Sequence, residues 1–105
     1  MTPEVRYERL ADDFRSETGV SRITEGKGFG SSGQLKVDGR IFVMLVRAEL
    51  VLKLPRARVD ELVASGDGRR FDAGKGKPMR EWLVVSSSSR KSWRELAREA
   101  FDFVR

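Results

Sequence analysis

Three short strings in the sequence match motifs that hold phosphate or carry a nucleophile in other proteins. The first, over residues 28–33, reads Gly-Phe-Gly-Ser-Ser-Gly and fits the spacing G-x-G-x-x-G. That fingerprint holds a dinucleotide when it follows a strand and opens a helix, because the helix N-terminus then meets the pyrophosphate. Here a strand pattern follows the glycines instead. We therefore interpret them as positions for turns and close backbone approach.

The other two strings lack residues that their chemistry requires. Residues 74–78 read Gly-Lys-Gly-Lys-Pro, without the Ser or Thr that follows the lysine of a phosphate-binding loop. Residues 88–91 read Ser-Ser-Arg-Lys and fit Ser-x-x-Lys, but the companion motifs of serine–lysine acyl-transfer enzymes do not accompany them. Helix capping explains these serines, so the sequence predicts no nucleophile.

The sequence contains no histidine and no cysteine. Zinc and most transition-metal sites therefore lose their usual ligands, and a Ser-His-Asp triad cannot be built. Disulfides are excluded as well, which is typical of a cytoplasmic protein. We predict no catalytic residue, no metal site and no cofactor, and hence a non-enzymatic protein. Catalysis by carboxylates stays open as the alternative.

Basic side chains outnumber acidic ones, 21 to 16, which gives a formal net charge of +5. Such an excess favours anionic partners such as nucleic acid, whose counterions are released on binding. The best candidate contacts lie in or beside a Gly-rich loop predicted over residues 66–78, and they are Arg69, Arg70, Lys75, Lys77 and Arg80. A solvated loop with no partner is the alternative, since acids and bases are interspersed along the chain. Trp82 and Trp93 fall in apolar patterns and are predicted as core residues rather than base-stacking platforms.

Hydrophobic periodicity predicts the elements that must position these residues. Apolar residues at helical spacing follow a Thr2 cap. A second helical stripe follows a capping box formed by Ser92 and Glu95, with Ser89 as an alternative cap one turn earlier. Between them, alternation of apolar residues predicts a three-strand meander with a tight turn at residues 38–39. The predicted strands span residues 35–37, 41–46, 50–54 and 79–85, with a short helix before Gly66.

The length of 105 residues suits one domain with one core. The predicted order is α-β-β-β-α-β-α, which defines a single α+β domain over residues 1–105, two-layered with an antiparallel sheet. Any extra edge strand would come from the two Gly-rich regions, residues 20–33 and 66–78. No stretch approaches the roughly 18 apolar residues of a membrane span, so we predict no membrane partner.

Both faces of the predicted strand over residues 41–46 are apolar. Strict alternation places Phe42, Met44 and Val46 on one face of the sheet and the alternate residues of the strand on the other face. Helices that cover one face of an antiparallel sheet leave the other face to the rest of the chain or to a second copy. In the second case Phe42, Met44 and Val46 form the face of a homodimer.

Glycines and apolar residues recur in a known order along nearly the whole chain. They include the turn over residues 28–33, the hairpin over 37–42, the Leu-Val-Leu-Lys-Leu strand over 50–54, the Gly-Arg-Arg-Phe segment over 68–71 and the aromatic strand over 79–85. Together they resemble the N-terminal domain of TfoX-like proteins, with the MmcQ/YjbR-like group as a neighbour. One departure is Gly28, where the TfoX-like turn usually carries methionine. The resemblance implies a two-layer α+β, secretion-chaperone-like fold without a known active site or cofactor, and it transfers no catalytic residues.

The combined prediction is a non-enzymatic, cytoplasmic binding or regulatory module that acts through protein contacts. Its partner would be an unknown protein or a second copy of the chain. The alternative is a nucleic-acid-binding or transcription-associated protein that uses the basic Gly-rich loop.

Overall fold

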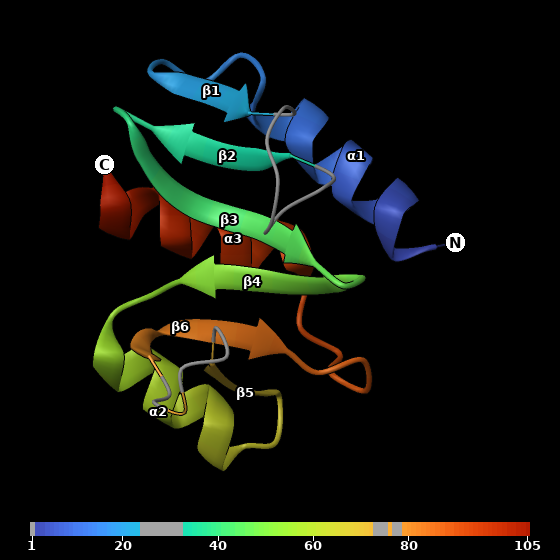
Figure 1. The fold of residues 1–105 in the computed structure, drawn as a ribbon, viewed down its shortest axis with the longest axis vertical. Coiled ribbons are helices and arrows are strands. Elements are labelled where there is room, and N and C mark those ends of the chain that lie inside the picture. The colour runs from blue at the N-terminus through green and yellow to red at the C-terminus, as the bar shows by residue number, and fades with distance from the viewer. Residues whose placement is uncertain (1, 24–32, 73–75, 77–78) are drawn as a thin grey trace.

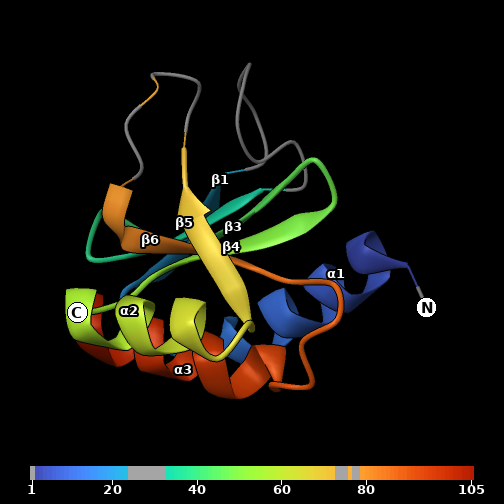
Figure 2. The same cartoon turned by 90° about the horizontal axis from the view of Figure 1, so that it is seen from below.

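The computed structural model describes residues 2–23, 33–72, 76 and 79–105 of the chain. Within them, six strands form one antiparallel sheet in the order β1-β2-β3-β4-β6-β5, and three helices pack on one face of it (Figures 1 and 2). The predicted two-layer α+β class with an antiparallel sheet is confirmed. The elements are α1 (Pro3–Phe14), β1 (Val20–Ile23), β2 (Gln34–Val37), β3 (Arg40–Val46), β4 (Glu49–Lys53), α2 (Arg56–Ala64), β5 (Gly68–Phe71), β6 (Met79–Val85) and α3 (Trp93–Val104).

Two strands go beyond the four that periodicity predicts. β1 and β5 form the two edges of the sheet, and each comes from one of the Gly-rich regions. The prediction of a loop over residues 66–78 is therefore wrong for Gly68–Phe71, which pairs with β6. Two arginines in this strand interrupt the alternation of apolar residues by which a strand is predicted. Gly68 permits its close approach to β6, because a Cβ there would lie 2.5 Å from the Val84 carbonyl oxygen.

Both long helices begin at the predicted caps. Thr2 Oγ1 accepts a hydrogen bond from the Val5 N–H at 3.1 Å, and this cap opens α1. Ser92 Oγ accepts one from the Glu95 N–H at 3.3 Å, and this cap opens α3. The apolar stripes of the two helices pack on the sheet in the main core, to which they contribute Tyr7, Leu10, Ala11, Phe14, Leu96, Ala97, Ala100, Phe101 and Val104.

A β-bulge in β3 interrupts the predicted alternation. Leu35 of β2 pairs with Val43 of β3. The next residue, Lys36, pairs with Ile41, so Phe42 is an additional residue without a partner of its own. A bulge of this kind places two residues of one strand opposite one residue of the other and re-aims the side chain at the extra position.

The bulge turns Phe42 toward the helices. Its side chain is fully buried in the main core. The centroid of its ring lies 5.3 Å from that of Phe14 and 5.5 Å from that of Phe101. The prediction that Phe42 belongs to a homodimer face on the opposite side of the sheet is therefore wrong.

The face opposite the helices, here called the outer face, carries a second and smaller apolar cluster. Met44 and Val46 belong to it, as alternation predicts, yet each is only 6% exposed. The chain therefore covers this face at Met44 and Val46 by itself. The exposed apolar surface on which the predicted homodimer depended is not present at these two residues. The outer cluster consists of Met44, Val46, Val51, Phe71 and Val84, with the half-buried Trp82 packed against it.

Candidate functional site

The described cations of the predicted basic loop lie in two strands. Arg69 and Arg70 lie in β5, and Arg80 lies in β6. Lys75 and Lys77 lie outside the described residues. Arg69 and Arg70 line one hollow of the surface, whereas Arg80 lines another, so the structure does not bring the three described cations together.

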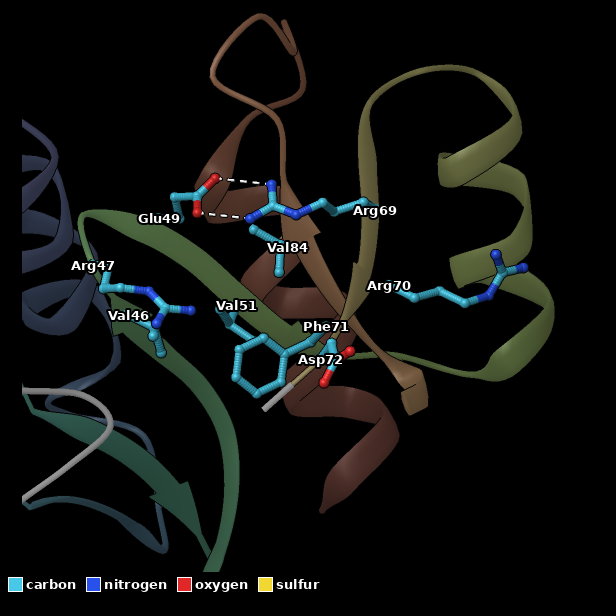
Figure 3. Close-up of a pocket in the computed structure, with 9 residues that line it drawn as sticks. All are labelled: Val46, Arg47, Glu49, Val51, Arg69, Arg70, Phe71, Asp72 and Val84. Carbon is cyan, nitrogen blue, oxygen red and sulfur yellow. Dashed lines mark hydrogen bonds and ion pairs between the residues drawn. The ribbon is translucent and has the colours of Figure 1, made fainter. Parts of the chain in front are cut away.

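Arg69 and Arg70 are both paired with carboxylates. Arg69 donates two hydrogen bonds to Glu49, from Nη1 to Oε2 at 3.0 Å and from Nη2 to Oε1 at 2.8 Å (Figure 3). These bonds stabilise the carboxylate and so lower the pKa of Glu49 below its ordinary value. Arg70 Nη2 donates to Oδ1 of Asp60 in α2. Both cations are therefore partly neutralised within the chain before any partner binds.

The first hollow lies between the β3–β4 turn and β5, and is here called the Arg47 hollow (Figure 3). Its volume is about 80 Å³, well below the roughly 300 Å³ at which ligand pockets begin. Such a space can hold one small group but cannot enclose a whole substrate. Four buried residues of the outer cluster, Val46, Val51, Phe71 and Val84, line it together with the charged residues Arg47, Glu49, Arg69, Arg70 and Asp72.

The second hollow lies at the end of β4 and the start of β6, and is here called the Trp82 hollow. It is open and has a volume of about 430 Å³. Lys53 and Trp82 face each other across the two strands, and the Lys53 Nζ lies 5.7 Å from the centroid of the Trp82 ring. A cation at this distance is attracted by the negative face of the ring. The hollow is lined by Lys53, Arg56, Met79, Arg80, Glu81 and Trp82.

The pattern of β4 places these residues side by side. The two leucines of β4 are fully buried in the main core, so alternation turns Lys53 to the outer face. Pro55 precedes α2, which begins at Arg56. One more hydrogen bond, from the Leu54 N–H to the Glu81 carbonyl oxygen at 2.9 Å, holds the end of β4 against β6. The cations of β4, α2 and β6 therefore meet at one place.

The cations of the Trp82 hollow differ from most arginines of the described chain. Within the residues that the structure describes, Lys53, Arg56 and Arg80 form no ion pair. Elsewhere, eight arginines of the described chain pair with carboxylates, as Arg58 does with Glu99 at 2.9 Å, whereas Arg6, Arg9, Arg40, Arg47 and Arg90 form no ion pair with described residues. The hollow is lined by three cations and one carboxylate, that of Glu81. Three cations against one carboxylate give the hollow a net positive charge.

Sequence reasoning finds Arg80 but misses the other members of the hollow. It does not single out Lys53 or Arg56, and it assigns Trp82 to the core. The structure shows Trp82 half-buried, with one part packed on the outer cluster and another part lining the hollow. The signal that identifies the site is the cross-strand pairing of Lys53 with Trp82, which requires knowing that β4 is a neighbour of β6.

A scan against models of known families, a search of curated proteins and a search of solved structures returned no match. The resemblance to the N-terminal domain of TfoX-like proteins therefore stays a prediction. Among the described residues, no group of three or more acidic, histidine or cysteine side chains is placed to hold a metal ion. None of the described helices has the length and apolar character needed to cross a membrane.

Proposed function

We propose that the protein is a non-enzymatic binding module that contacts single-stranded nucleic acid through the Trp82 hollow. The observation that carries this proposal is the gathering of Lys53, Arg56 and Arg80, which form no ion pair with described residues, around the half-buried Trp82. Proteins that bind single strands combine cations, which contact backbone phosphates, with aromatic rings on which bases stack. The hollow supplies both elements in one place.

The open form of the hollow supports a polymer more than an enclosed substrate. Arg56, Arg80 and Met79 are exposed, and Met79 reaches 41%. A strand can enter such a surface from the side and slide along it. Catalysis on a small molecule, by contrast, generally takes place where water is excluded. The shape therefore agrees with binding rather than turnover.

A protein partner has less support from the described surface. Its exposed large apolar side chains are Val5, Met79 and Phe103, while Met44 and Val46 are buried. Protein interfaces depend on aromatic and apolar anchors that enter pockets of the partner. The charged hollow therefore favours the nucleic-acid alternative over the predicted contact with an unknown protein or a second copy. In this proposal the protein acts in the cytoplasm, where single-stranded RNA is abundant.

Fluorescence anisotropy with a labelled oligothymidylate, measured at low and physiological salt, tests the proposal. Each phosphate contact removed, by Lys53→Gln or Arg80→Gln, should reduce the slope of log K against log salt by about 0.7. Trp82→Leu should weaken binding by about 1–3 kcal/mol through lost stacking, with little change in the salt slope. Circular dichroism checks that each variant is folded.

Arg40→Gln is the matched control. Arg40 is exposed, opens β3 beside the β2–β3 turn and lines neither hollow. The Arg40→Gln variant loses one positive charge, as the test variants do, and should leave the affinity and the salt slope nearly unchanged. Wild-type binding by folded Lys53→Gln and Arg80→Gln variants, or an equal loss in Arg40→Gln, would overturn the proposal.

A further inference from the structure

The β3–β4 turn adopts a backbone conformation that its residues do not favour. Arg47 and Ala48 form a two-residue turn between the paired residues Val46 and Glu49, with φ of 48° and 66°. Positive φ at both positions is normal for a tight hairpin turn, and Asn-Gly or Asp-Gly is the usual solution. The other tight hairpin of the sheet follows that rule, because Asp38 and Gly39 occupy it.

Neither Arg nor Ala has a local reason to adopt this conformation. A Cβ meets the following carbonyl group there, and only Gly, Asn or Asp escapes most of the cost. Unfavourable backbone conformations of this kind gather at functional sites, where they hold a side chain in place. The side chain that this turn holds over the outer face is that of Arg47.

Arg47 is placed to contact an anion. In Figure 3 its side chain extends from the turn toward Val51 and the Phe71 ring, along the edge of the Arg47 hollow. It forms no ion pair with any described residue. The neighbouring Glu49 carboxylate is held by two hydrogen bonds from Arg69, which reduces its repulsion of a second anion.

Strand β4 connects the two hollows. Its first residue, Glu49, lines the Arg47 hollow, and its last residue, Lys53, lines the Trp82 hollow. Four steps along an antiparallel strand cover about 14 Å. A stacked nucleic-acid strand has one phosphate about every 3.4 Å, so this distance corresponds to about four nucleotides, and to fewer when the strand is extended.

We propose that Arg47 is a second phosphate contact, and that a bound single strand spans the outer face from the Trp82 hollow to the Arg47 hollow, above the fully buried Val51 of β4. This inference rests on the proposed function, and it adds the path and the length of the bound nucleic-acid segment. A dinucleotide fills the Trp82 hollow alone, whereas a longer strand also reaches Arg47. The contribution of Arg47 therefore depends on the length of the ligand.

The test compares a thymidine dinucleotide with an oligothymidylate of about twelve nucleotides, which lies within the range of site sizes of single-strand binders. Arg47→Gln should weaken binding of the long strand about three- to tenfold and reduce its salt slope by about 0.7. It should leave the affinity for the dinucleotide unchanged. Arg47→Lys keeps the charge and should retain most of the affinity, and Arg40→Gln again serves as the matched control.

Folding of the variants can be separated from binding. The double variant Arg47→Asn with Ala48→Gly removes the charge and relaxes the turn. It should be at least as stable as the wild type and should still lose affinity for the long strand. If the Arg47 variants bind the long strand like the wild type while Arg80→Gln weakens it, the inference is overturned and the proposed function stands. If Arg80→Gln and Lys53→Gln also bind like the wild type, both fail.

Discussion

Replacing Phe42 and Phe101 by leucine, singly and together, tests the bulge that turns Phe42 into the main core. The two rings are buried, with centroids 5.5 Å apart and an interplanar angle of 71°. Edge-to-face pairs of this kind contribute about 0.5–1.5 kcal/mol beyond the burial of their area. Leucine keeps much of the apolar volume and removes the ring contact. The double-mutant cycle should therefore give a coupling free energy of about 1 kcal/mol.

A second cycle, Phe42→Leu with Val84→Ala, is the control. Val84 belongs to the outer cluster, on the other side of the sheet from Phe42. Substitutions without shared contacts add to within about 0.3–0.5 kcal/mol. Strict alternation without the bulge would place Phe42 on the outer face and reverse the two couplings.

The assay is urea unfolding followed by tryptophan fluorescence, which Trp82 and Trp93 provide. Domains of this size have a free energy of unfolding of about 5–15 kcal/mol, so single leucine variants should stay folded in water. Equal slopes of the unfolding free energy against urea are required before the values are compared. No coupling between Phe42 and Phe101, together with strong coupling between Phe42 and Val84, would refute the bulge.

Two further outcomes are expected from the turn and the ion pair beside the Arg47 hollow. Ala48→Gly should stabilise the protein by about 0.5–1 kcal/mol, because glycine adopts the φ of 66° without steric cost; a thermal melt should show a Tm several degrees higher, and a lower Tm would contradict the strain at this turn. Glu49 has its pKa lowered in the folded protein, so its pair with Arg69 stabilises the fold above the ordinary pKa of the carboxyl and loses that effect as the pH falls through the lowered value. Arg69→Gln should remove this part of the dependence of the unfolding free energy on acid pH. The change should be no more than about 1 kcal/mol, because both side chains are over a third exposed. An unchanged pH profile would argue against the pair, and the control Arg40→Gln should keep the wild-type profile.

Elements with strong periodicity and clear end signals could be predicted from the sequence. Thr2 and Ser92 cap the helices they were expected to cap, because side-chain capping is a local interaction. The strands with alternating leucines and valines could be predicted as well, because alternation along a strand is also a local pattern. β5 could not, since its Arg69 and Arg70 give no apolar alternation and its pairing with β6 is long-range.

The sequence-based predictions for Phe42 and for the site differ from the structure for a common physical reason. A bulge depends on how two strands fit together, so the sequence of β3 alone cannot show it. In the same way, Lys53 and Trp82 become neighbours through the pairing of β4 with β6. The sequence shows the excess of positive charge and indicates Arg80, but it does not show which cations are paired, as Arg69 is with Glu49.

The position of β6 between β4 and β5 also makes the Trp82 hollow depend on a pairing between strands that are far apart in the sequence. α2 and β5 lie between β4 and β6 in the sequence, whereas β2, β3 and β4 are joined by two-residue turns. The pairing of β4 with β6 closes a longer loop than the two-residue turns of the meander, so it costs more conformational entropy. The Trp82 hollow exists only while β4 and β6 are paired, and a nucleic-acid strand bound there would stabilise that pairing.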